Sequence, residues 1–196
     1  MRWAWEPAQS PPTEIPGDYF RFYEINPQVI AFSAGNHPFF TFLRDSHAQT
    51  DVVEGDARIS LERERESGGF EGFDVLILDA FNGDAIPIHM LTREAFRLYL
   101  DRLRDANGII AVHITNRMLD LAPVLAAIAN EFELHGIEID SPSMGDSVLE
   151  SRWVLLSRSN PVLTTPYSDL NFKPLRSDRT ELWTDQYSSL FGVLIR

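Results

Sequence analysis

The chain has 196 residues, of which 44% are hydrophobic, a size that supports one well-packed domain and leaves little room for two. Its formal net charge of -12, without any run of Lys or Arg, argues against nucleic acid and anionic membranes as partners and favours a cationic ligand. The absence of cysteine removes disulfides, thiolate nucleophiles and cysteine zinc sites. No signal-peptide core and no apolar run of about 18 residues is present, so we expect a cytoplasmic protein.

The first part of the chain changes from an irregular to a regular pattern near residue 19. Residues 1–18 are rich in proline and small polar residues and predict an irregular N-terminal arm. The following segments predict, in chain order, a strand over Tyr19–Tyr23, a helix over Pro27–Ala34, a strand over Thr50–Val53, a helix over Ala57–Glu66 and a strand over Phe73–Leu78.

Strand and helix patterns continue to alternate up to residue 158. They predict a helix from the Thr92 cap to about Arg104, a strand over Gly108–Ile114, a helix over Leu119–Glu131, and closing strands over Leu134–Ile139 and Arg152–Ser157 with a turn at Gly145-Asp146. Residues 159–196 are a C-terminal extension that we expect to pack on this domain. The alternation predicts a Rossmann-like α/β fold over residues 19–158, with a mostly parallel sheet and helices on both faces. Such sheets bind ligands beyond the carboxyl ends of their strands.

Acidic residues follow three successive predicted strands, namely Glu24, Asp56 and Asp79. Glu24 suits the two hydroxyls of a ribose, because a carboxylate offers two acceptor oxygens. Asp56 can accept the exocyclic amine of an adenine while the backbone N–H of Ala57 reaches a ring nitrogen, and Asp79 would lie nearest to the reacting centre. Taken singly, each acid could instead be a turn residue or a helix cap. The series in register favours a shared binding site.

Six ordered motifs extend this pattern from residue 22 to residue 187. They read FYEINP over 22–27, GDAR over 55–58, FDVLILDAF over 73–81, GDAIPIHMLT over 83–92, AVHITNR over 111–117 and WTDQY over 183–187. As an ordered set they resemble the spermidine synthase-like proteins, the polyamine aminopropyltransferases, and particularly the bacterial branch often fused to membrane segments. The resemblance implies the fold of the S-adenosylmethionine-dependent methyltransferases.

The resemblance also implies a reaction, the transfer of an aminopropyl group from decarboxylated S-adenosylmethionine to a polyamine such as putrescine, without a metal. It implies that Glu24 holds the ribose, that Asp56 and Ala57 hold the adenine, and that Asp79 orients and deprotonates the attacking amine. Two further residues would contact the substrate, Asp84 and Tyr187. A homo-oligomer or a partner chain is expected. A non-catalytic or truncated relative that keeps the fold, and an S-adenosylmethionine-dependent methyltransferase, stay open as alternatives.

The chain departs from the family pattern in two places. The family's first strand and Gly-rich turn have no counterpart before Glu24, where only Pro16-Gly17-Asp18 stands, and the loop after Asp79 reads AFNGD in place of a compact acid-Ser-x-acid-Pro motif. Loss of a central strand would leave unpaired strand edges, so we expect a sheet that is incomplete at the N-terminus. Either the Trp3–Trp5 segment substitutes, or a partner chain covers the gap, or the gene start is truncated, and we favour the last two together.

The five histidines give no metal-binding pattern. They lie at positions 37, 47, 89, 113 and 135, with no pair spaced by four residues and no HExxH motif. No metal cofactor is therefore expected. We interpret His113, at a predicted strand end, as a hydrogen-bonded structural residue.

Overall fold

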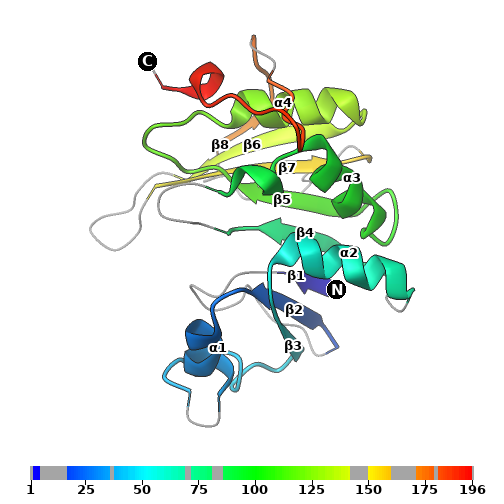
Figure 1. Cartoon of the computed structure of the whole chain (residues 1–196), viewed down its shortest axis with the longest axis vertical. Coiled ribbons are helices and arrows are strands. Elements are labelled where there is room, and N and C mark those ends of the chain that lie inside the picture. The colour runs from blue at the N-terminus through cyan, green and yellow to red at the C-terminus, as the bar shows by residue number, and fades with distance from the viewer. Residues whose placement is uncertain are drawn as a thin grey trace.

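One mixed sheet organises the structure, a computed structural model that describes residues 2–4, 17–35, 38–68, 72–80, 86–141, 150–159, 171–178 and 181–195. The sheet has eight strands in the order β3-β2-β1-β4-β5-β7-β6-β8 (Figure 1). The first five strands in this order are parallel, and the last three pair antiparallel with their neighbours. The predicted α/β fold with a mostly parallel sheet is therefore confirmed.

The strands are β1 (Arg2–Ala4), β2 (Tyr19–Glu24), β3 (Gln49–Glu54), β4 (Val75–Leu78), β5 (Ile109–His113), β6 (His135–Ser141), β7 (Ser151–Ser157) and β8 (Asn171–Pro174). The helices are α1 (Pro27–Ala34), α2 (Ala57–Ser67), α3 (Arg93–Asp101) and α4 (Ala122–Glu131), with short 3₁₀ turns over Ile88–Met90 and Phe191–Val193. All elements predicted between residues 19 and 158 are present, with ends shifted by at most three residues. The turn predicted at Gly145-Asp146 lies outside the described residues.

β1 occupies the central position that we expected to be empty. Arg2–Ala4 pairs in parallel with β2 on one side and with β4 on the other, with Trp3 aligned to both Phe20 and Val75. The expectation of a missing strand is therefore wrong. The described part of the Trp3–Trp5 segment occupies its position, which was the least favoured of the three explanations. A strand this short carries no alternating pattern of hydrophobic and polar residues, which is why the sequence did not reveal it.

The C-terminal extension belongs to the same core as the sheet. It adds β8, an unpredicted strand that pairs with β6, and it buries Trp183, whose side chain is 1% exposed. The carbonyl oxygen of Trp183 accepts the N–H of Arg93 at 2.8 Å, and that of Val193 accepts the N–H of Asp120 at 2.7 Å. The extension is thus hydrogen-bonded to the first turn of α3 and to the loop before α4.

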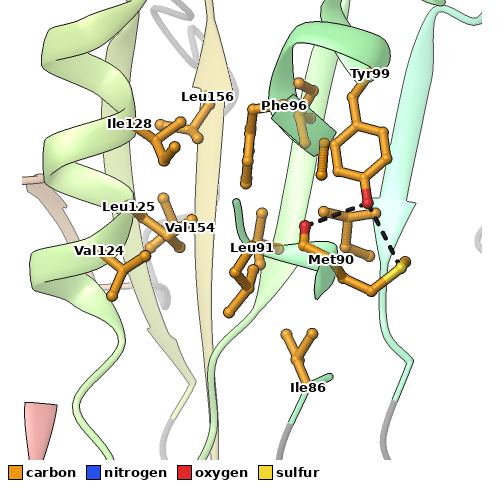
Figure 2. Close-up of a cluster of buried hydrophobic side chains, with 14 of the residues drawn as sticks. Ile86, Met90, Leu91, Phe96, Tyr99, Val124, Leu125, Ile128, Val154 and Leu156 are labelled. Atoms are coloured by element: carbon orange, nitrogen blue, oxygen red, sulfur yellow. Dashed lines mark hydrogen bonds between the residues drawn. The ribbon is translucent and has the colours of Figure 1, made fainter. Parts of the chain in front are cut away.

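Three helices lie side by side across one face of the sheet, α2, α3 and α4 (Figure 1). Between α4 and β7, Ile128 lies beside Leu156 and Leu125 beside Val154, in an apolar cluster that also includes Phe96 of α3 (Figure 2). The hydroxyl of Tyr99 is buried there and donates to the carbonyl oxygen of Met90 at 3.2 Å. Burial raises the pKa of Tyr99, so the ring stays neutral in this core.

Capping residues place the helix starts next to the strand ends. The side chains of Asn26, Asp56 and Thr92 accept backbone N–H groups from the first turns of α1, α2 and α3. α2 ends at Gly68, whose φ of 71° is the left-handed conformation that glycine adopts at little cost. The turns from β2 to α1 and from β3 to α2 are therefore short and fixed.

The buried Trp183 provides a test of whether the extension contributes to the core. Replacing Trp183 with alanine is expected to lower the free energy of unfolding by about 3–5 kcal/mol, because it removes a large side chain and leaves a cavity. Urea denaturation followed by circular dichroism measures the change. Phe191→Ala is the control: that side chain is 88% exposed, so the same measurement should change by less than about 0.5 kcal/mol. Equal stability of the Trp183 variant and the wild type would contradict this arrangement.

Candidate functional site

The three predicted acids follow strand ends at one edge of the sheet. Glu24 is the last residue of β2 and is aligned with Glu54 at the end of β3. Asp56 follows two residues after Glu54, and Asp79 comes directly after β4. Because these strands are parallel, their carboxyl ends meet at the same edge. The structure therefore brings the strand-end acids to one side of the domain, as the sequence predicts.

A cavity of about 610 Å³ opens at this edge, a volume within the range of small-molecule sites. Its wall includes Glu24, Asp56 and Ala57, three of the predicted site residues, together with Ala80 and His89. The wall comes from the turns after β2, β3 and β4 and from the 3₁₀ turn that precedes α3. We call it the strand-end cavity.

Glu24 is buried in the wall of the strand-end cavity, with 8% of the residue exposed. Its Oε1 accepts the backbone N–H of Asn26 at 2.7 Å, which fixes the carboxylate. Among the described residues no hydrogen-bond partner is recorded for Oε2, so this oxygen is available to a ligand. Beside it, the hydroxyl of Tyr23 donates to Glu64 at 2.9 Å, and burial raises the pKa of Tyr23, so the tyrosine is a neutral part of the wall.

Gly55 lets the backbone approach the strand-end cavity closely. Its φ is 146°, a conformation that other residues rarely adopt, and a Cβ there would lie 3.2 Å from Ser60 Oγ. Its N–H donates to the carbonyl oxygen of Glu24 at 2.9 Å. This residue was quoted in the sequence motif but not chosen as a site residue, and its conformation is what closes the turn between β3 and α2.

Asp56 is engaged at both carboxylate oxygens. Its Oδ1 accepts the N–H of Ile59 at 3.0 Å and caps α2, and its Oδ2 lies 3.1 Å from Nε2 of His89. The helix-cap interpretation of Asp56 is therefore confirmed. The neighbouring Ala57 N–H lies in the first turn of α2, where a helix leaves its donors without intrahelical partners. Both residues line the strand-end cavity.

Asp79 lies beside this cavity but is not among the described residues that line it. Its Oδ1 is instead 2.5 Å from Nδ1 of His113, which ends the adjacent strand β5. The next residue, Ala80, does line the cavity. Asp84, the second acid predicted for this loop, lies outside the described residues.

No family model matches the chain. A polyamine aminopropyltransferase of Vibrio vulnificus strain CMCP6 is 33% identical over 107 residues, which are 54% of this chain and 33% of that protein. The chain thus spans about a third of the length of this curated relative.

Solved structures of spermidine synthases share the fold. A probable spermidine synthase from Corynebacterium glutamicum ATCC 13032 has a TM-score of 0.60 at 18% identity, over 88% of this chain and 66% of that one. A spermidine synthase in complex with the transition-state analogue AdoDATO has a TM-score of 0.52 at 14% identity, over 80% of this chain and 50% of that one. The chain is therefore similar to a polyamine aminopropyltransferase in sequence and to spermidine synthases in fold.

Tyr187 lines a second cavity, of about 530 Å³, and does not line the strand-end cavity. The second cavity is polar and is bordered by Arg58, Thr92 and Asp185, and His89 lines both cavities. Tyr187 is 61% exposed. The sequence grouped it with the substrate site, whereas the structure places it in a turn of the C-terminal extension.

Asp185 anchors that turn through two side chains. Both carboxylate oxygens accept from Arg58, at 2.7 and 2.5 Å, and Oδ1 also accepts the hydroxyl proton of Thr92 at 2.7 Å. The hydrogen bond with Arg58 holds the pKa of Asp185 below its ordinary value of 3.8. The spacing of the sequence gave no indication of this pair, because 127 residues separate the partners.

Two further findings concern only the described part of the chain. Within it, no group of three or more His, Asp or Glu residues is arranged to hold a metal ion. No helix there is long and apolar enough to cross a membrane.

The Asp185 anchor gives a pH-dependent prediction. The pKa of the Asp185 carboxyl is lower in the folded than in the unfolded chain. Its contribution to the free energy of unfolding is therefore present above about pH 3.8 and is lost as the pH falls through the folded-state pKa. The side chain is 41% exposed, so we expect a contribution of at most about 1 kcal/mol. Asp185→Asn should lower the free energy of unfolding at pH 7, and the difference from wild type should shrink in acid.

Urea unfolding at several pH values between 3 and 7 measures this difference. Asp178→Asn is the control, since Asp178 is an exposed carboxylate in the same extension. A difference between wild type and the Asp185 variant that stays constant, or that grows as the pH falls, would rule out the Arg58 pair as its source.

Proposed function

We propose that the strand-end cavity binds the adenosine part of decarboxylated S-adenosylmethionine and that the protein transfers its aminopropyl group to a polyamine such as putrescine. The observation that carries this proposal is the buried Glu24, which lines the cavity and whose Oε2 has no hydrogen-bond partner among the described residues. A carboxylate fixed by one backbone N–H and open at its other oxygen is suited to ribose hydroxyls. The relationship to an aminopropyltransferase supports the choice of donor.

The adenine is proposed to lie against the start of α2. The Asp56 carboxylate would accept the exocyclic amine, and the Ala57 N–H would donate to a ring nitrogen. Although Asp56 Oδ2 already contacts His89, each carboxylate oxygen has two lone pairs and can accept a second donor. The cap and the ligand can therefore use the same side chain.

Asp79 is proposed to prepare the amine for attack. An ammonium group cannot attack carbon, so one of its protons first passes to the Asp79 carboxylate. The nitrogen lone pair then forms a bond to the methylene carbon next to the sulfonium, the carbon–sulfur bond breaks, and its electron pair stays on sulfur to give neutral methylthioadenosine. The positive charge of the sulfonium ends on the new secondary ammonium. Carboxylates along this edge lower the cost of bringing two cations together.

The acidic character of the whole chain suits this substrate pair. A formal net charge of -12 attracts a polyamine and a sulfonium donor over long range. The cytoplasmic location and the homo-oligomer expected from the sequence belong to the same proposal.

A second candidate is a non-catalytic relative that keeps the fold and the adenosine cavity. It is favoured by one observation, that residues 1–16 contain no glycine, whereas the resemblance to the family implies a Gly-rich turn before Glu24. The two candidates have the same fold and differ in whether they catalyse aminopropyl transfer. Nucleoside binding and turnover therefore have to be measured separately.

Nucleoside binding tests the role of Glu24. Glu24→Gln keeps an oxygen for the Asn26 N–H but loses the charged acceptor, and should weaken the binding of methylthioadenosine about 10- to 100-fold, the value of one or two hydrogen bonds to a charged group. Isothermal titration calorimetry measures the affinity. The matched control is Glu54→Gln, aligned with Glu24 in the sheet but exposed and outside the cavity. Unchanged affinity in the Glu24 variant would remove the proposed ribose contact.

Turnover tests the role of Asp79. Asp79→Asn should reduce aminopropyl transfer to putrescine by about 100-fold or more, because the amide cannot take up the proton, while the circular dichroism spectrum stays that of the wild type. Chromatography of the polyamine product measures the rate. Asp101→Asn, at the exposed end of α3, serves as the control. Equal turnover by the Asp79 variant would eliminate its catalytic role, and a wild type that binds nucleoside without transfer would favour the non-catalytic candidate.

A further inference from the structure

Asp79 has a partner that the proposed chemistry does not yet use, the imidazole of His113. Leu78 and Val112 are aligned in the β4–β5 pair, so Asp79 and His113 are adjacent at the end of it. Asp79 Oδ1 lies 2.5 Å from His113 Nδ1, and their side chains are only 16% and 20% exposed. With little water around it, this hydrogen bond is stronger than one at the surface.

The partners of the two ring nitrogens determine where the imidazole proton resides. His113 Nε2 lies 2.6 Å from Thr115 Oγ1, and this oxygen accepts the backbone N–H of Arg152 at 2.8 Å. The Asp79 carboxylate can only accept, so Nδ1 carries the proton of the hydrogen bond between them. In the neutral ring Nε2 is then an acceptor, and the Thr115 hydroxyl can donate to it while its oxygen accepts from Arg152.

The plane of the imidazole is held by stacking. Trp153 is aligned with His113 in the β5–β7 pair. The two rings are nearly parallel, with centroids 4.5 Å apart and an angle of 6° between their planes. The ring therefore has contacts at both nitrogens and on one face. A residue with a single structural hydrogen bond would have fewer contacts.

We propose that His113 is a positioning residue for Asp79, whose Oδ1 it holds so that Oδ2 receives the proton of the attacking amine. This inference rests on the proposed function. With Oδ1 engaged by the imidazole, Oδ2 is the oxygen that remains for the amine. Displacement of a reacting group by about 1 Å can cost about 100-fold in rate, so loss of this hydrogen bond should lower kcat strongly.

Two substitutions separate the hydrogen bond from the stacking. His113→Phe keeps a ring to stack on Trp153 but removes both nitrogens, and should lower kcat about 100-fold with little change in the KM of the adenosyl donor. His113→Asn places an amide N–H close to the position of Nδ1, and should keep kcat within about tenfold of wild type. The control is His135→Phe at an exposed position of β6, which should leave both parameters unchanged.

Two kinetic outcomes would overturn the inference. One is a wild-type kcat in the His113→Phe variant. The other is an equal loss in the phenylalanine and asparagine variants when circular dichroism shows both to be folded, since the N–H would then not be the group that matters.

Heteronuclear NMR of the ring nitrogens gives a readout that does not require activity. In the wild type we expect His113 to carry its proton on Nδ1 and to have an unprotonated Nε2, and the opposite tautomer would overturn the inference. A wild type without transferase activity would contradict the proposed function. The NMR tautomer would still test whether His113 donates its hydrogen bond to Asp79. Failure of the function and failure of the positioning role are thus distinguishable.

Discussion

The parallel pairing of β2 with β3 and of β4 with β5 is the constraint on which the candidate site depends. Glu24 faces Glu54 in the first pair, and Leu78 faces Val112 in the second, so each pair ends together. β1 lies between β2 and β4 and joins the two pairs into one sheet, whose strand ends lie along the same edge. Because side chains alternate between the faces of a sheet, a slip of one residue would turn a strand-end carboxylate to the opposite face.

The elements predicted correctly are those with a strong local signal. The buried run of β4 and the capped starts of α1, α2 and α3 can be recognised without knowledge of the rest of the chain. The two missed strands, β1 and β8, are only three and four residues long. Neither carries an alternating pattern by itself, and both are defined by the neighbours with which they pair.

The residues of the site could be predicted in part, but the contacts between them could not. That acids follow the strands can be read from the sequence, but what each acid contacts cannot. Asp79 and His113 are 34 residues apart in the chain, and Asp56 and His89 are 33 residues apart. The sequence correctly indicated a hydrogen-bonded role for His113 without identifying the partner. Tyr187 was assigned to the substrate site because its motif matched, whereas its position follows from contacts that join distant segments.

The start of α2 shows that structural and binding roles of one acid are compatible. Asp56 caps the helix through the Ile59 N–H, and Arg58 in the same turn holds Asp185 of the C-terminal extension. One helical turn thus connects the strand-end cavity to the extension. His89 lines both cavities and contacts Asp56 Oδ2, the oxygen that an adenine amine would share. A ligand at Asp56 would therefore share this oxygen with a residue that also forms part of the wall of the second cavity.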